Sequence, residues 1–274
     1  MDSAYEIKQA KISTRIYAFL IDLLIFIVIF SASMFLLNTY SKDYNDSKKI
    51  YDEKCLEHNL VIEKTNENGE KYTANWTVYD FMMSSFSSPG CHVEKEEDIK
   101  DVSDECQIEY SDFLTKQNEV FGKDEVAVST YNKIVKYRIG FYAISSFLAL
   151  LIINIVFPLI FKNGQTLGKK VFKLGLVSKK GIKVNFANIG LRFLIGIFAF
   201  EVFPFMLYLA VSNVYTIGLL LGMALSFVNF CLFIFTKNHV MVHDYVGGTV
   251  VVDLHTTIVF NSVEEMNRIK GNAK

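Results

Sequence analysis

The chain has 274 residues, of which 51% are hydrophobic and 24 are phenylalanine, and this composition is too apolar for a typical soluble protein. Its 28 Lys and Arg residues nearly balance its 29 Asp and Glu residues, so the net charge of −1 argues against a nucleic-acid partner. The four cysteines show neither metal-ligand nor C-x-x-C spacing, which excludes zinc-site and thioredoxin-like motifs. The composition therefore indicates a membrane protein.

Four apolar runs are long enough to cross a bilayer, which takes about 20 residues each. Residues 1–37 are expected to form a short arm and the first transmembrane helix. A signal peptide is not favoured, because the apolar run is too long for one and contains an aspartate where a signal peptide is apolar. The other three runs predict a second helix over 139–161 and a third and fourth within 191–236. The chain is thus expected to be an all-α membrane protein with four transmembrane helices and both termini on one side.

The positive charges near the ends of these runs predict the orientation. Twelve Lys and Arg residues lie on the side of the termini, and seven lie near the ends of the 38–138 loop. We therefore expect a multi-pass protein of the cell membrane with cytoplasmic N- and C-termini. The basic loop 162–190 and the tail 237–274 are then cytoplasmic, and the loop is expected to lie against anionic lipid of the inner leaflet.

Residues 38–138 differ in composition from the rest of the chain, with 21 acidic against 13 basic residues. They are expected to form a large, mostly helical extracytoplasmic domain inserted between the first two helices. Asn68-Gly69 lies between two strand-like segments and predicts a β-hairpin. Cys91 and Cys106 are candidates for a disulfide in an oxidising compartment, with free thiols as the alternative.

The basic loop contains a second pattern typical of strands. Residues 174–177 and 181–186 flank a Ser-Lys-Lys turn and predict a small cytoplasmic β-hairpin, with which residues 249–252 are expected to pair. The preceding Gly164-Gln-Thr-Leu-Gly168-Lys169-Lys170 does not form a Walker phosphate-binding loop, because only three residues separate the glycines and no Ser or Thr follows the lysine.

Charged residues inside apolar runs are the candidate functional residues, because they are costly in a membrane. Asp22 lies in the first run, and Arg15 precedes it by about two helical turns on the same face, too far for a firm direct bond. A third group near Asp22 is therefore implied, and Asp22 is either a structural polar contact between helices or part of an ion or proton pathway. Glu201 lies in the third run near Pro204, and both readings apply to it as well. His239 and His243 have i, i+4 spacing, but a hydrogen-bonding role at the membrane interface is favoured over a metal site.

Several of these segments together resemble the RDD family of bacterial membrane proteins, named for one arginine and two aspartates. The resemblance rests on the Arg15–Asp22 segment, the Gly164–Lys169 segment, Arg192 and the segment from Asp244 to Thr249. It implies that Arg15, Asp22 and Asp244 are the naming residues and that they form one cluster. Some family members are thought to exchange cations for protons or to move other ligands, and others to regulate membrane enzymes.

Two functions follow as alternatives. In the first, Asp22, Asp244 and Glu201 form a cation or proton pathway gated by Arg15 and Arg192, which would require a homo-oligomer because four helices are few for a transporter. In the second, the helices are an anchor and residues 38–138 bind or regulate a partner protein in the envelope. The sequence contains no nucleophile and base constellation, so we expect neither an enzyme nor a bound metal or cofactor.

Overall fold

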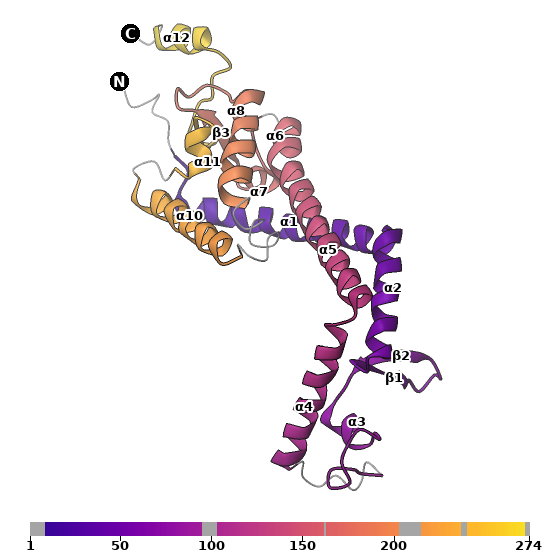
Figure 1. Ribbon diagram of the computed structural model, residues 1–274. Coiled ribbons are helices and arrows are strands. Elements are labelled where there is room, and N and C mark those ends of the chain that lie inside the picture. The colour runs from indigo at the N-terminus through magenta and orange to yellow at the C-terminus, as the bar shows by residue number, and fades with distance from the viewer. Residues whose placement is uncertain (1–8, 95–102, 162, 203–214, 237–239, 272–274) are drawn as a thin grey trace. The chain divides into compact units, whose positions relative to one another are not determined.

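The computed structural model describes residues 9–94, 103–161, 163–202, 215–236 and 240–271 (Figure 1). The chain divides into two compact units. Unit 1 comprises Met1–Leu37 and Ile139–Lys274, and unit 2 comprises Asn38–Arg138. The division coincides with the composition shift at 38–138, and each unit is described separately below.

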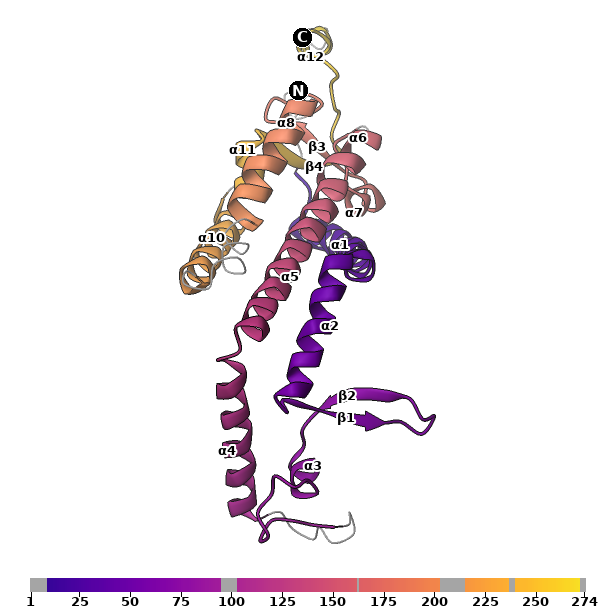
Figure 2. The same ribbon diagram turned by 45° about the vertical axis from the view of Figure 1, so that its right-hand side comes forward.

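Among the residues that the structure describes, two helices are long and apolar enough to span a membrane. Helix α1 (Ile12–Tyr40) is one, and the other runs from α5 (Glu125–Leu151) through a π-helical turn, η3 (Ile152–Val156), into α6 (Phe157–Ile160) (Figure 2). The predicted span, 139–161, falls in the second part of this helix, and residues 125–138 extend the helix toward the N-terminus. These residues contain no Gly or Pro that would stop a helix.

The structure describes the third expected span only in part, whereas α10 (Tyr215–Phe235) has the bounds of the fourth apolar run. Helix α8 (Phe186–Leu191) leads into the π-helical segment η4 (Arg192–Val202). Residues 203–214, which the expected third span and its turn include, lie outside the described residues. Short helices complete unit 1, namely α7 (Leu167–Val171), α11 (Val242–Val246) and α12 (Val263–Gly271).

Unit 1 also contains a two-stranded antiparallel sheet. Strand β3 (Leu174–Ser178) pairs along its whole length with β4 (Thr249–Asp253), as the strand composition of 249–252 predicted. The predicted hairpin within 174–186 is reduced to a tight turn at Gly181 and an isolated bridge between Val177 and Lys183. Four consecutive residues of each strand are buried, so β4 provides β3 with a continuously buried partner, which the alternating 181–186 segment cannot.

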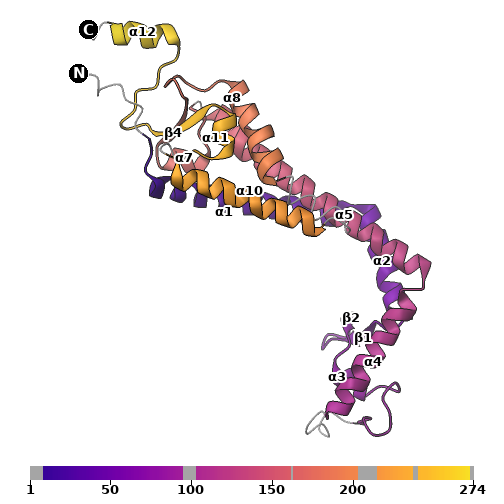
Figure 3. The ribbon, with the colours of Figure 1, turned by 60° about the vertical axis from the view of Figure 1, so that its left-hand side comes forward.

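The first turns of α1 lie beside this sheet. Figure 3 shows α7, α11 and β4 gathered at that end of α1. The Ala10 N–H donates to the Val251 carbonyl at 3.3 Å, and Ala10 and Ala18 are buried with Leu174, Leu176 and Val251 in one core cluster. The start of α1 is therefore fixed to the sheet by both hydrogen bonding and apolar packing.

Unit 2 contains α2 (Lys42–Glu57), the hairpin β1 (Val61–Thr65) and β2 (Lys71–Asn75), α3 (Val78–Met82) and α4 (Asp104–Phe121). The hairpin predicted around Asn68-Gly69 is confirmed, and Gly69 has a φ of 82°, a conformation open to glycine at no steric cost. A disulfide joins Cys91 to Cys106 at the start of α4. Aromatic rings pack between α3 and α4, where Phe81 is fully buried against the rings of Tyr110 and Phe113.

Candidate functional site

The carboxylate of Asp22 is held by the start of α7. Thr166 caps this helix, its hydroxyl donates to Asp22 Oδ2 at 2.5 Å, and the backbone N–H of Gly168 donates to Asp22 Oδ1 at 2.8 Å. A Cβ at position 168 would lie 2.0 Å from the carbonyl oxygen of Ala18, so only glycine allows α7 to approach α1 this closely. The third group that the spacing of Arg15 and Asp22 implied is therefore a hydroxyl and a backbone amide, and not a cation.

Asp244, on α11, has two arginine partners. Arg15 Nη2 of α1 lies 3.3 Å from Asp244 Oδ2, and Arg192 Nη1 at the start of η4 donates to Asp244 Oδ1. The Thr249 hydroxyl lies 3.4 Å from Oδ1 and also accepts a hydrogen bond from Arg192 at 3.2 Å. Asp244, Arg192 and Thr249 are all buried, so this ion pair joins α1, η4, α11 and β4 inside the protein.

Close backbone packing places η4 and α11 together. A Cβ at Gly196 would lie 2.4 Å from His243 Cα, and one at Gly247 would lie 2.9 Å from Arg192 Cβ. The side chain of Asn188 in α8 adds a hydrogen bond to the Gly247 carbonyl at 2.9 Å. These contacts hold Arg192 against Asp244 with little freedom.

Burial and charge act in opposite directions on Asp244. Burial alone would raise its pKa, but the positive charge of Arg192, with smaller contributions from His243, Arg15 and Lys169, holds the pKa well below the ordinary range. Asp244 is therefore ionised at any physiological pH. A carboxylate that is paired in this way does not readily take up a proton.

Lys169 is the cation that the sequence analysis did not single out. Burial, and then the positive charge of Arg192, lower its pKa to about 7, against the opposing effect of Asp244 and Asp22. Within the described part of the chain its ammonium group makes neither a hydrogen bond nor an ion pair. Its position in the Gly164–Lys169 segment was the available signal, but the sequence presented it as one of several lysines of a basic loop.

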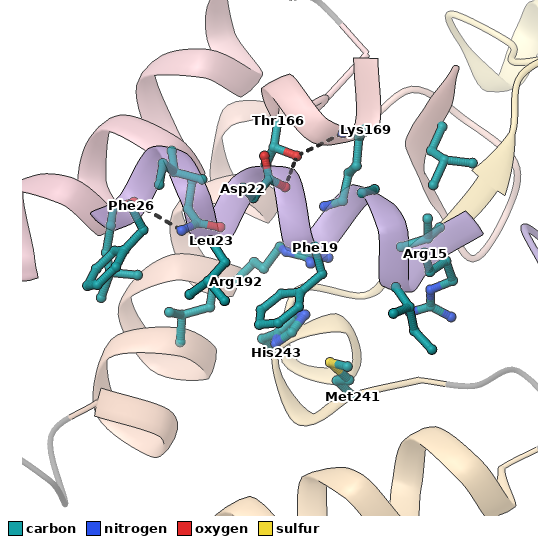
Figure 4. Close-up of a pocket in the computed structure, with 18 of the residues that line it drawn as sticks. Arg15, Phe19, Asp22, Leu23, Phe26, Thr166, Lys169, Arg192, Met241 and His243 are labelled. Carbon is teal, nitrogen blue, oxygen red and sulfur yellow. Dashed lines mark hydrogen bonds between the residues drawn. The ribbon is translucent and has the colours of Figure 1, made fainter. Parts of the chain in front are cut away.

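These groups surround a cavity of about 410 Å³ in unit 1. Figure 4 shows Lys169 reaching from α7 and Arg192 from η4 toward the stretch of α1 that carries Phe19 and Asp22. Most of the wall is apolar. The lining residues from α1 and the charged residues from the other elements are Arg15, Ile16, Ala18, Phe19, Asp22, Leu23, Phe26, Lys169 and Arg192.

The structure brings together four of the five charged residues that the sequence suggested. Arg15, Arg192 and Asp244 are in direct contact, and Asp22 lines the same cavity as both arginines. The side chain of Glu201 lies outside the described residues, as does His239. His243 Nε2 lies 3.8 Å from Asp244 Oδ1, which agrees with a role in the polar cluster.

One further group in unit 2 has the composition of a metal site. Ligand atoms of Glu57, His58 and Asp124 lie within 4.8 Å of one another. However, Asp124 already accepts a hydrogen bond from His58 at 2.8 Å, and Lys54 lies 3.1 Å from the same carboxylate oxygen. The ammonium group of Lys54 thus supplies the positive charge that a metal ion would bring, and we assign no metal to this group.

The RDD family matches residues 108–248 of the chain, slightly more than half of its length. The chain belongs to the RDD family. This RDD protein is therefore a membrane protein, as the two long apolar helices also indicate. The match contains Lys169, Arg192 and Asp244 but does not include α1 with Arg15 and Asp22, and it extends into unit 2 from Ile108 onward. No curated protein and no solved structure is significantly similar to the chain.

Proposed function

We propose that this RDD protein is a membrane-anchored binding protein, in which the charged cluster of unit 1 holds its helices together and unit 2 contacts a partner outside the bilayer. The observation that carries the proposal is that two of the three carboxylates suggested for an ion or proton pathway, Asp22 and Asp244, already have protein partners. Asp22 accepts from Thr166 and Gly168, and Asp244 is bound by two arginines. A cation or proton pathway would have to displace these partners at every step.

The energy of the Asp244 cluster supports a structural role. Removing one partner of a buried ion pair leaves an uncompensated charge and typically costs about 3–5 kcal/mol. Asp244 and Arg192 are both buried and come from different elements, so the cost would apply to the packing of α11 against η4. Because the packing of α11 against η4 depends on the Asp244–Arg192 pair, a fixed structural contact suits Asp244 better than a change of its charge in each transport cycle.

Unit 2 has the features of a stable binding module. The Trp76 indole N–H donates to the Asn59 carbonyl at 2.9 Å, and the Tyr110 hydroxyl donates to the Trp76 carbonyl at 2.6 Å. These bonds connect the hairpin to α4, and the Cys91–Cys106 disulfide fixes the start of the same helix. The excess of eight acidic residues in 38–138 favours a basic partner surface. No catalytic step is part of the proposal.

Transport is the second candidate, and the cavity favours it. The cavity of about 410 Å³ that Asp22 lines is large enough for a small ligand. Helices that serve only as a membrane anchor would not need such a cavity. In this reading Asp22 exchanges its bonds to Thr166 and Gly168 for a proton or a cation. Asp22→Asn would then abolish proton coupling.

Proteoliposomes distinguish the two candidates. We would reconstitute the full chain, the Asp22→Asn variant and a chain in which residues 46–134 are replaced by a short Gly/Ser linker, with a pH-sensitive dye inside the vesicles. The linker needs to be only short because the rings of Tyr44 and Tyr137 lie 6.3 Å apart. The proposal predicts no cation-dependent proton flux in any of the three. Flux that persists without unit 2 and disappears in Asp22→Asn would contradict it and establish transport.

The binding half of the proposal needs its own measurement. A lysine-rich peptide would be titrated against the full chain and against the linker chain in detergent, as a probe of the acidic unit. Binding that depends on unit 2 and weakens with salt is expected, because exposed charges are screened over about 8 Å at physiological ionic strength. Equal binding to both chains would refute unit 2 as the interaction surface.

A further inference from the structure

The cavity beside α1 has an excess of positive charge. Three cationic side chains, Arg15, Lys169 and Arg192, line it, whereas Asp22 is its one carboxylate within the described residues. Asp244 neutralises the arginines from behind the wall. Counting both aspartates, the described residues place three positive charges against two negative charges, which leaves an excess of one positive charge among them.

Lys169 carries this excess charge in its protonated form, which a bound anion would stabilise. Each oxygen of Asp22 accepts a hydrogen bond, one from the Thr166 hydroxyl and one from the Gly168 amide, and among the described residues Asp22 and Lys169 act on each other through space without forming an ion pair. Among the residues that the structure describes, no other group binds the Lys169 ammonium directly. An ammonium group surrounded by apolar walls is costly without a counter-ion, and a bound anion would remove that cost.

The rest of the cavity is suited to hydrocarbon. Its walls include Phe19, Leu23 and Phe26 of α1 and Phe233 of α10. Phe19 is 61% exposed and Leu23 is 38% exposed, so the α1 wall continues into the apolar outer surface of a helix long enough to span the membrane. A ligand with an apolar chain can therefore place its head group at Lys169 while its chain stays beside α1.

Other ligand classes fit less well. A metal cation would meet three cationic side chains and a carboxylate that is already bonded, and an entirely apolar ligand would leave the Lys169 charge without a partner. A small soluble anion would satisfy Lys169 but would leave the apolar walls against water. The volume of about 410 Å³ lies in the lower part of the range of small-molecule sites, roughly 300–1,000 Å³, and takes one ligand.

We propose that this cavity binds an anionic amphiphile, with a phosphate or carboxylate head group at Lys169 and an acyl chain along the apolar face of α1. Lysine binds phosphate as a point charge, and Arg192 and Arg15 add to the positive potential. The proposal does not depend on the function of unit 2, because every residue of the site belongs to unit 1. It holds equally for a membrane anchor that binds lipid and for a carrier of such a ligand.

Binding of labelled lysolipids to the full chain in a neutral detergent tests the proposal. Lysophosphatidylglycerol and lysophosphatidylcholine with the same fluorophore would be titrated by anisotropy. The anionic probe should bind at least tenfold more tightly, a difference of about 1.4 kcal/mol. Lys169→Met should remove most of this preference. The matched control is Lys170→Met, because the Lys170 ammonium lies over the Phe161 ring and outside the cavity, and it should leave the preference unchanged.

A second pair of variants tests the position of the chain without changing any charge. Leu23→Trp should fill the cavity from its partly exposed side and weaken both probes about tenfold. Leu24→Trp should have no effect, because Leu24 is 64% exposed and does not line the cavity. This pair keeps the test valid if Lys169→Met fails to fold.

Three outcomes would overturn the proposal. The first is equal binding of the anionic and zwitterionic probes, and the second is an equal effect of a variant and its matched control. The third is complete displacement of the probe by inorganic phosphate together with an affinity that is independent of chain length, which would assign the site to a free anion.

Discussion

Replacing Gly168 by alanine should separate α7 from α1 and destabilise unit 1. The added Cβ would lie 2.0 Å from the Ala18 carbonyl oxygen and 3.0 Å from Asp22 Oδ1, whereas ordinary contacts begin near 3.4 Å. The nearest atom belongs to the helix backbone, so no side-chain rotation relieves the clash. One of the two segments has to move by more than 1 Å, roughly the difference between these distances.

The magnitude follows from two losses. Overpacking at a rigid contact costs about 1–3 kcal/mol. The movement also breaks the 2.8 Å hydrogen bond from the Gly168 N–H to Asp22, and a hydrogen bond to a charged group contributes about 1.5–3 kcal/mol. We therefore expect Gly168→Ala to lower the free energy of unfolding by roughly 3–6 kcal/mol.

Gly190 in α8 provides the matched control. Within the part of the chain that the structure describes, a Cβ at this position meets no atom within 4 Å. Alanine is favoured over glycine in a helix by up to about 1 kcal/mol, so Gly190→Ala should be neutral or stabilising. Thermal unfolding of both variants in the same detergent, followed by circular dichroism, measures the contrast. Equal melting temperatures would show that the contact between α7 and α1 is not rigid, and the reasoning about Asp22 would have to be abandoned.

Three further predictions concern other parts of the chain. Reducing the Cys91–Cys106 disulfide should destabilise unit 2 by about 3 kcal/mol, as expected for a loop of 15 residues. It should leave unchanged the difference in melting temperature between Gly168→Ala and the wild type, because that difference arises in unit 1. Asp244→Asn should cost about 3–5 kcal/mol because it removes the counter-charge of the buried Arg192 and of the partly buried Arg15, and simultaneous replacement of Arg192 by Met should recover part of that loss in the melting temperature. Burial lowers the pKa of Lys169 to about 7, so between pH 7 and the ordinary lysine range the unfolded chain binds one more proton than the folded chain, and stability should rise with pH there. Lys169→Met should flatten that rise in melting curves recorded across the pH series.

The sequence alone predicted the features that depend on neighbouring residues. Apolar length and composition identified the two long helices, and Asn68-Gly69 predicted the hairpin of unit 2, because a tight turn depends only on the residues within it. Asp22 was recognisable because an acidic residue inside an apolar run is costly wherever the rest of the chain lies, and Asp244 was recognisable through the resemblance to the RDD family. The same local reasoning did not predict the π-helical segments or the continuation of α5 back to Glu125.

Only the tertiary structure decided which partner each charge has. Asp22 bonds to Thr166, 144 residues away, and Arg15 bonds to Asp244, 229 residues away, so the unspecified third group implied near Asp22 is a hydroxyl together with a backbone amide. Lys169 looked like one of several lysines of a basic loop and instead lines the cavity. The strand β3 paired with the distant β4 in preference to its neighbour. In each case the result depends on the depth at which the folded chain buries a group and on the groups it meets there, and no local pattern contains that information.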